Sequence, residues 1–229
     1  MIRYVISVII ASTALLLCYV WYPIYILSGK RAGMLFIRAF FATLLKANNI
    51  TVEIAGLEHI DSSQNYLVLS NHQSIFDIPI VAATLPLDTR IFAKQELLHI
   101  PIFGWGMWLY DFVFVDRKKK KDAIQSLHRA SNILNKFSFL VFPEGTRSKD
   151  GKVHSFKTGA IEIARLSGNP VLLIAVKGSG NIMKKESLFV SGGHIKMKVF
   201  PPEKVEKTDN RKERAEAFQK TIASFVELQ

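Results

Sequence analysis

Cysteine is nearly absent from this sequence, since Cys18 is the single one among 229 residues. One cysteine excludes an internal disulfide scaffold and a zinc cluster built from cysteines. Glycine and proline are also few, with 13 and 8 residues, which excludes collagen-like and low-complexity chains. The length corresponds to one domain, or to one domain with an appended segment.

Acidic residues are absent from positions 1–49, although the whole chain contains 19 of them. The basic residues of that segment are Arg3, Lys30, Arg31, Arg38 and Lys46. They supply +5 of the formal net charge of +11. A basic chain can bind nucleic acid, a membrane surface or an anionic substrate, and the hydropathy of this segment decides among the three.

The segment Tyr4–Gly29 contains 26 residues without a charge. Its first 19 residues, Tyr4–Tyr22, would form a helix of about 28 Å, which nearly matches the ~30 Å hydrocarbon core of a bilayer. A cleaved signal peptide is the alternative, but its apolar region is usually about 7–15 residues long and no small-residue cleavage site follows here. The pattern favours an uncleaved anchor, so we expect membrane lipids, and no nucleic acid, as partners.

A second apolar stretch, Gly33–Leu45, is interrupted only by Arg38. A helix lying in the membrane interface, or the return arm of a shallow hairpin, fits its length better than a second crossing. Residues 1–49 are therefore predicted to form a two-helix membrane-anchoring unit, followed by one globular domain at 50–229. More basic residues follow the first segment than precede it, which predicts that the domain lies on the cytoplasmic face of the membrane. We expect that membrane to be a bacterial inner membrane.

From Ile50 onward, short apolar runs alternate with helical patterns. Seven runs are typical of strands: Ile50–Ala55, Tyr66–Ser70, Arg90–Ala93, Phe112–Val115, Ser138–Phe142, Val171–Val176 and His194–Phe200. Apolar residues on one face predict helices at Lys119–Lys136, Phe156–Leu166 and Arg211–Val226. Gly168 and Pro170 mark the end of the second helix. The alternation predicts an α/β domain whose mixed, largely parallel sheet is flanked by helices.

A first group of polar residues, Ser70–Asp77, follows a predicted strand. His72 and Asp77 would not meet on a regular helix, because positions five apart differ by about 140°. They can meet if His72 lies on the turn after the strand and Pro79 lies in the first turn of the next helix. A carboxylate on one imidazole nitrogen leaves the other free as a general base. The alternative is that Asp77 caps a helix at Ile78–Leu85 and His72 is a polar loop residue.

A second group, Phe142–Ser148, also follows a strand. Gly145 allows close backbone approach, backbone N–H groups around it are possible donors, and the fork of Arg147 suits a phosphate. The alternative is a surface turn with a solvated arginine. Because both groups follow strands, we expect them in the crevice where open α/β sheets bind ligands.

The two groups together predict a reaction. The His–Asp pair supplies a base, but neither Ser70 nor Ser74 lies in a G-x-S-x-G turn that would make it a nucleophile. The nucleophile is therefore expected to be a substrate hydroxyl. A base beside a phosphate site predicts acyl transfer to a phosphate-bearing alcohol, with no covalent acyl-enzyme and no metal.

At these positions the sequence resembles the glycerolipid acyltransferases. The matching motifs are Asn71–Asp77, Phe114–Arg117, Phe142–Ser148, the strand that opens at Pro170, Lys94–Leu97, Ile100–Gly104 and Phe156–Ala160. The resemblance runs from about Leu57 to Val176, with the motifs in the family's order. The chain's size and N-terminal segment are similar to those of the branch that acylates 1-acyl-sn-glycerol 3-phosphate, also called lysophosphatidic acid.

The resemblance implies that His72 is the catalytic base and that Asp77 orients it. The implied phosphate-binding residues are Glu144, Gly145, Thr146, Arg147, Arg117 and Lys94. The implied reaction, in phospholipid biosynthesis, transfers a fatty acyl group from acyl-coenzyme A or acyl carrier protein to the sn-2 hydroxyl of lysophosphatidic acid and makes phosphatidic acid. The thioester is a co-substrate, and no cofactor is expected. Two alternatives are an acyltransferase for another lyso-lipid and a non-catalytic membrane lipid-binding protein.

Overall fold

The computed structural model describes residues 30–100, 103–109, 112–115, 120–184 and 189–228, together with residues 5, 8, 9 and 13. Apart from those four positions, the predicted anchor Tyr4–Tyr22 lies outside the described residues. Within the described ranges, no helix is both long and apolar enough to cross a bilayer. The described fold is therefore that of the globular domain from Ile50 onward and of the helix Lys30–Ala47 that precedes it.

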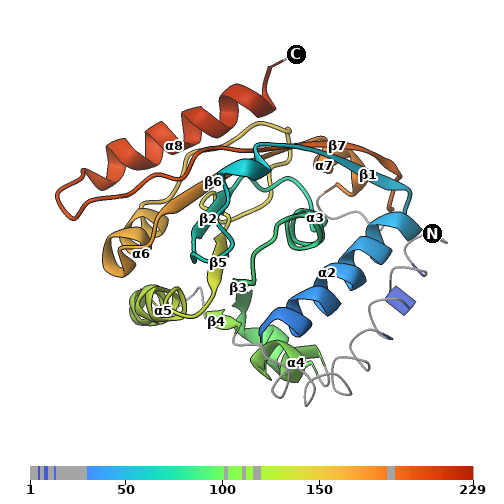
Figure 1. Ribbon diagram of the computed structural model, residues 1–229, viewed down its shortest axis with the longest axis horizontal. Coiled ribbons are helices and arrows are strands. Elements are labelled where there is room, and N and C mark those ends of the chain that lie inside the picture. The colour runs from blue at the N-terminus through green and yellow to red at the C-terminus, as the bar shows by residue number, and fades with distance from the viewer. Residues whose placement is uncertain are drawn as a thin grey trace.

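A mixed sheet of seven strands forms the centre of the described domain (Figure 1). The strands are β1 (Ile50–Ala55), β2 (Leu67–Ser70), β3 (Thr89–Lys94), β4 (Val113–Val115), β5 (Ser138–Val141), β6 (Val171–Lys177) and β7 (Gly193–Val199). Their order is β1-β7-β6-β2-β5-β3-β4, and every neighbouring pair is parallel except β6 with β7. The predicted mixed, largely parallel sheet is confirmed, with each strand end within one residue of its expected position.

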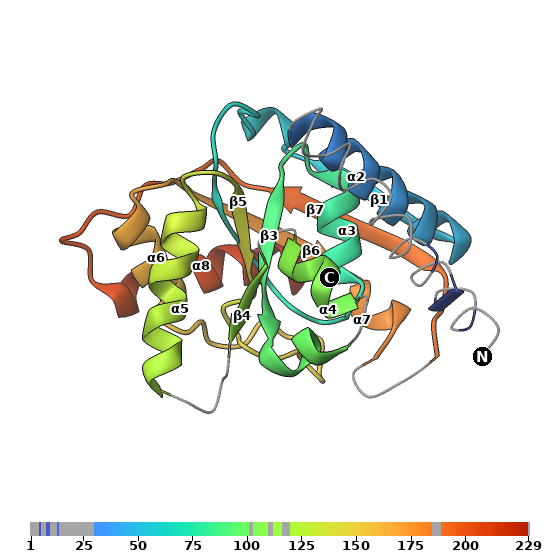
Figure 2. The same cartoon turned by 90° about the horizontal axis from the view of Figure 1, so that it is seen from below.

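Helices cover both faces of this sheet, as Figures 1 and 2 show from two directions. One face carries α5 (Lys120–Ile133), α6 (Gly159–Ser167) and α8 (Arg211–Val226), and the other carries α2 (Lys30–Ala47) and α3 (Asp77–Thr84). The connections contain α4 (Phe103–Leu109), α7 (Ser179–Ile182) and the single 3₁₀ turns η1 (Leu57–His59) and η2 (Gln95–His99). The predicted α/β architecture is confirmed.

The central strands are apolar on both faces because helices cover both. Successive side chains of a strand point to opposite faces of the sheet. Leu67 of β2 and Leu173 of β6 accordingly lie in the core under α5, α6 and α8. Their neighbours Val68 and Leu172 lie in the second core, under α2 and α3. All four side chains are completely buried, so β2 and β6 are fixed in the middle of the domain.

Helix α2 joins the apolar N-terminal segment to the sheet. It packs against α3 and β1, and buries Leu44 and Leu45 in the second core. Leu35, near its other end, is 63% exposed. The stretch Gly33–Leu45 is thus helical as expected, but its last turn belongs to the globular core. A membrane contact of the first turns stays a prediction.

Candidate active site

The two predicted groups of polar residues meet at one edge of the sheet, because β2, β5 and β6 are parallel neighbours and end there. Asn71 determines how the chain leaves β2. Its Nδ2 donates to the carbonyl oxygen of Val176, and its Oδ1 accepts from the N–H of the same residue, both at 2.8 Å. The side chain thereby bonds β6 as a strand backbone would, and His72 is free to turn out of the sheet.

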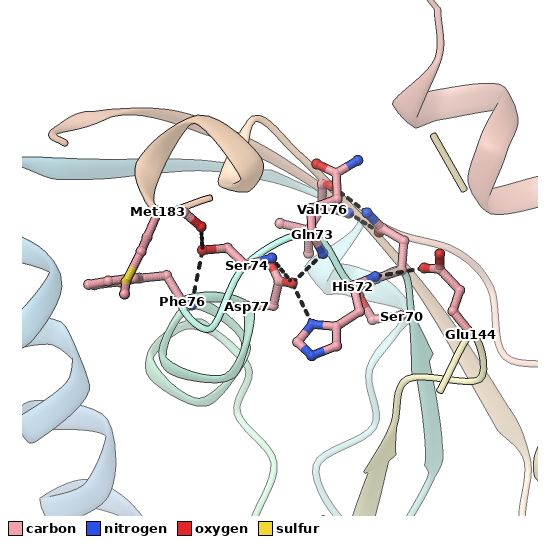
Figure 3. A network of polar contacts seen from close by, with 10 residues as sticks. Ser70, His72, Gln73, Ser74, Phe76, Asp77, Glu144, Val176 and Met183 are labelled. Carbon is pink, nitrogen blue, oxygen red and sulfur yellow. Dashed lines mark hydrogen bonds and ion pairs between the residues drawn. The ribbon is translucent and has the colours of Figure 1, made fainter. Parts of the chain in front are cut away.

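His72 and Asp77 meet on this turn, as the sequence predicted (Figure 3). His72 Nδ1 lies 2.8 Å from Asp77 Oδ2, with the aspartate completely buried and the imidazole 17% exposed. Because a carboxylate oxygen can only accept, Nδ1 carries the proton of this bond and Nε2 is left with its lone pair. In Figure 3, Nε2 points away from Asp77.

Asp77 is the first residue of α3, but its carboxylate serves the turn that precedes the helix. Oδ2 also accepts from the backbone N–H groups of Gln73 and Ser74, each at 2.8 Å. One oxygen therefore binds the imidazole and two consecutive amides of the same turn. The alternative of a helix-capping aspartate beside an unrelated loop histidine does not describe this arrangement.

Phe142, the residue after β5, supports the face of the His72 ring. The two rings are stacked with centroids 4.0 Å apart and planes inclined by 16°. Stacking of this kind adds a favourable contact between the two rings. With Asp77 bonded to one edge and Phe142 against one face, the imidazole is held from two sides.

Glu144 links the two loops through its buried carboxylate. Oε1 accepts from the backbone N–H of His72 at 2.8 Å, and Oε2 from that of His154 at 3.0 Å. Burial raises the pKa of Glu144 above its ordinary value, and the two backbone N–H donors offset part of that rise. With both oxygens accepting from the backbone, the carboxylate holds the His72 turn rather than presenting itself to a phosphate.

Two further hydrogen bonds join the same loops. The N–H of Ser148 donates to the carbonyl of His72 at 2.7 Å, and Gln73 Nε2 donates to the carbonyl of Gly151 at 2.6 Å. Both polar groups of the His72 backbone are therefore bonded to the second loop. The position of His72 is therefore coupled to the position of the second loop.

Gly145 forms a tight turn in the second loop. Its φ is 74°, in the left-handed region that favours glycine, and its N–H donates to the carbonyl of Phe142 at 3.0 Å. This N–H is therefore used within the turn, and the expectation that other backbone N–H groups around Gly145 bind an anion stays a prediction. In the same loop, Thr146 is exposed and Arg147 is half-buried.

The other two predicted phosphate ligands cannot be placed in the same way. Lys94 is the last residue of β3, which pairs with β5, so its backbone ends at the edge that carries the site. Its side chain, and the whole of Arg117, lie outside the described residues. Their contribution to the pocket stays a prediction.

A family model described as acyltransferase matches residues 51–177, which is more than half of the chain. The match includes both loops and the His72–Asp77 pair. The chain belongs to the acyltransferase family. The resemblance stated from the sequence motifs is thereby confirmed.

Two mammalian proteins are among the relatives that this chain resembles. The 1-acyl-sn-glycerol-3-phosphate acyltransferase alpha of Mus musculus is 36% identical over 156 residues, which cover 67% of this chain and 55% of the relative. The Homo sapiens protein of that name is 33% identical over 184 residues, covering 79% and 65%. This chain thus spans between about half and two thirds of their length.

A solved structure resembles nearly the whole chain. It is the crystal structure of the 1-acyl-sn-glycerophosphate (LPA) acyltransferase PlsC from Thermotoga maritima, with a TM-score of 0.85 and 26% sequence identity. The match covers 99% of this chain and 94% of that one.

Two residues of the acyltransferase site received no role from the sequence, although both lie in its motifs. Asn71 completes the backbone pairing of β6, and Phe142 stacks on the base. The sequence contains one general signal for these two residues, since each directly follows a buried strand, at the edge of the sheet where α/β proteins bind ligands. The pairing across the sheet that gives Asn71 its task is invisible in a linear sequence.

Glu144→Gln should lower the free energy of unfolding of the protein. Glutamine offers one acceptor oxygen, so the N–H of either His72 or His154 would face an NH₂ group and lose its partner. An unsatisfied buried donor costs about 1–3 kcal/mol, and we expect a loss of that size in the free energy of unfolding at neutral pH. Urea denaturation of both proteins measures it, and equal stability would contradict the assigned contacts.

The same pair of proteins should differ in its pH dependence. Because burial raises the pKa of Glu144 in the folded state, that state binds the proton more tightly than the unfolded chain does. The stability advantage of the wild type over the glutamine variant should therefore grow as pH falls through the raised pKa. It should level off below the ordinary glutamate pKa. An advantage that shrinks on acidification would contradict the direction of the shift.

Proposed function

We propose that this chain transfers a fatty acyl group from an acyl thioester to the sn-2 hydroxyl of 1-acyl-sn-glycerol 3-phosphate and makes phosphatidic acid for phospholipid biosynthesis. The observation that carries the proposal is the 2.8 Å bond between His72 Nδ1 and the buried Asp77, which leaves Nε2 as a base. The names of the relatives support the acceptor. The donor is acyl-coenzyme A or acyl carrier protein.

The hydroxyl groups beside His72 support a substrate nucleophile rather than a protein one. Ser70 is buried, and its Oγ donates to the carbonyl of Asn71 at 3.2 Å. Ser74 is buried as well, and its Oγ donates to the carbonyl of Met183 at 2.9 Å. Neither hydroxyl is directed to the imidazole, so neither takes the place of the attacking alcohol.

The proposed reaction has one addition and one elimination. His72 Nε2 takes the proton of the sn-2 hydroxyl while the oxygen forms a bond to the thioester carbonyl carbon. Collapse of the tetrahedral intermediate breaks the C–S bond, and the imidazolium returns the proton to the departing thiolate. Asp77 stabilises the positive charge on the ring between the two proton transfers. One ester and one thiol are formed, and the enzyme is regenerated.

The phosphate of the acceptor is proposed to lie at the loop Glu144–Arg147. In this arrangement Gly145 and Thr146 form its wall, Arg147 supplies charge, and Glu144 holds the loop to the His72 turn. Lys94 and Arg117 are proposed to add charge from β3 and from the segment after β4. The reaction needs no metal or other cofactor.

Arg147→Lys should weaken acceptor binding selectively. Lysine keeps the charge but loses the planar fork that can bind a phosphate with two parallel hydrogen bonds. Loss of one charge-assisted bond predicts an increase of about tenfold in KM for lysophosphatidic acid. Initial rates at saturating thioester measure this constant. An unchanged KM would show that Arg147 does not touch the acceptor.

The membrane is the proposed working surface, with residues 1–49 as the anchoring unit. The described domain supports this with exposed apolar side chains on and beside α4, where Trp105 is 55%, Trp108 is 64% and Ile100 is 46% exposed. Tryptophan favours the headgroup level of a bilayer. The cytoplasmic face follows from the excess of basic residues after the first apolar segment.

A panel of acceptors tests the proposed function. Purified full-length protein in lipid receives one labelled acyl thioester and, separately, lysophosphatidic acid, its phosphate-free monoacylglycerol and lysophosphatidylcholine. The proposal predicts a kcat/KM for lysophosphatidic acid at least about tenfold above the others, from one charge-assisted contact. Preference for another lyso-lipid would show that the chain is an acyltransferase with a different acceptor. Turnover with none of them would favour a lipid-binding protein.

A further inference from the structure

Lys157 lies over the Gly145 turn, and it has no role in the reaction steps proposed for His72 and Asp77. A Cβ atom added to Gly145 would lie 2.7 Å from Lys157 Nζ and 3.0 Å from its Cε. The end of the lysine side chain therefore fills the space that any larger residue at position 145 would need. The end of a lysine side chain can move, so the requirement for glycine at this position comes from its φ of 74°, while the short distance shows where the ammonium lies.

The fold holds the backbone of Lys157 beside this turn. Its N–H donates to the carbonyl of Pro143 at 2.9 Å. Phe156, the preceding residue, is buried in the core under α5, α6 and α8, and α6 begins at Gly159. The ammonium is thus brought to Gly145 by a segment that is fixed on both sides.

The ammonium of Lys157 is exposed and its charge is not neutralised by the protein. Among the described residues, Nζ has no hydrogen-bond acceptor and no carboxylate within ion-pair distance. The two carboxylates of this loop are engaged elsewhere, since Glu144 accepts from two backbone N–H groups and Asp150 is bonded to Ser148, Lys152 and His154. An unneutralised cation beside the loop that holds His72 raises the local concentration of anions.

We infer that Lys157 binds the phosphate of the acceptor, an inference that rests on the proposed function. An ammonium carries three donors and suits a phosphate monoester as a point charge. Its place over Gly145 brings it to the loop that contains Arg147 and that is bonded to the backbone of His72. A phosphate held there places the rest of the acceptor toward the base.

The experiment has to distinguish the phosphate of the acceptor from a second source of phosphate groups, the acyl donor. Acyl-coenzyme A also carries phosphates, which could reach the same ammonium. Lysophosphatidic acid and acyl-coenzyme A are therefore varied separately, and acyl pantetheine serves as a donor without the nucleotide phosphates. Binding of the acceptor predicts the same Lys157 effect with either donor.

Lys157→Met is the test variant, because methionine keeps an unbranched apolar stem and removes the charge. We expect KM for lysophosphatidic acid to rise about tenfold or more, the loss of one charge-assisted contact, while kcat falls less than threefold. The KM for acyl-coenzyme A should stay within twofold. Lys157→Arg should restore most of the acceptor affinity. Lys152→Met, an exposed lysine of the neighbouring loop, is the matched control and should leave every constant unchanged.

The outcomes separate this inference from the proposed function. Normal KM for lysophosphatidic acid in Lys157→Met, with wild-type turnover intact, overturns the inference alone, as does a change confined to acyl-coenzyme A. If the wild type turns over no lyso-lipid, the proposed function fails, and equilibrium binding of glycerol 3-phosphate then tests Lys157. Binding about tenfold weaker in Lys157→Met than in Lys152→Met supports the lysine as a phosphate ligand, and equal binding overturns it.

Discussion

His72→Ala is expected to lower kcat of the purified protein by about 10²–10⁴-fold, the usual contribution of a general base. The reason is that Nε2 is the nitrogen left free by the bond to Asp77, and the neighbouring serine hydroxyls are bonded elsewhere. KM for the acceptor should change little, because the phosphate contacts remain. Steady-state rates with lysophosphatidic acid and an acyl thioester measure the loss.

A stability measurement accompanies this variant, because His72 stacks on Phe142 and bonds Asp77. His72→Gln is the control for size and hydrogen bonding, since its amide can still donate to the aspartate but cannot act as a base. Both variants should fold and lose turnover together. Turnover of the glutamine variant near the wild-type rate would remove His72 from the chemistry.

Asp77 should separate stability from catalysis more sharply than any other residue of the site. Its Oδ2 accepts from His72, Gln73 and Ser74, all at 2.8 Å, in a completely buried position. Asp77→Ala leaves these donors without a partner and should cost about 2–5 kcal/mol of unfolding free energy, together with the activity.

Asp77→Asn should keep more of that stability than Asp77→Ala and still lose activity. The amide oxygen can take the position of Oδ2, and the NH₂ group the position of Oδ1, which has no hydrogen-bond partner in the described part of the chain. Without the negative charge, the imidazolium is no longer stabilised, and kcat should fall by about 10²-fold or more. Chemical denaturation and steady-state rates on the same preparations compare the two effects. An asparagine variant with full activity would show that Asp77 is purely structural.

Much of the fold follows from local patterns in the sequence. The apolar run Val171–Val176 is typical of a strand covered on both faces, and these residues of β6 are buried accordingly. Gly168 ends α6 with a φ of 70° and a bond from its N–H to Ala164, as a glycine in that position predicts. Patterns of this kind depend on neighbours in the chain, which a linear sequence contains.

Helix α4 was not predicted, because its two glycines lower helix propensity by about 1 kcal/mol each. Gly104 is explained by a contact that the sequence does not reveal. A Cβ there would lie 2.3 Å from the carbonyl oxygen of Leu97, so the helix starts against the backbone of η2. Local propensity and tertiary packing oppose each other here, and packing prevails.

The site was predictable to the extent that its residues are close in sequence. The spacing of His72 and Asp77, with Pro79 beyond, predicted a folded-back turn, and the bond between them is present. The task of Glu144 was not predictable, since it reaches the His72 N–H only when β2 and β5 pair, and the His154 N–H only when the loop after β5 folds back. The approach of Lys157 to Gly145 was not predictable either, because it forms only when the loop between the two residues closes.

The most direct test of the central claim is the product balance of a single reaction. Wild-type protein in lipid is given 1-acyl-sn-glycerol 3-phosphate and an acyl thioester with a labelled acyl group, and free thiol and labelled phosphatidic acid are both quantified. The acyl position is then found by selective hydrolysis at sn-2. The account predicts one thiol released for each phosphatidic acid, the label at sn-2, and neither product from His72→Ala. Thiol release without phosphatidic acid, or equal product from His72→Ala, would contradict it.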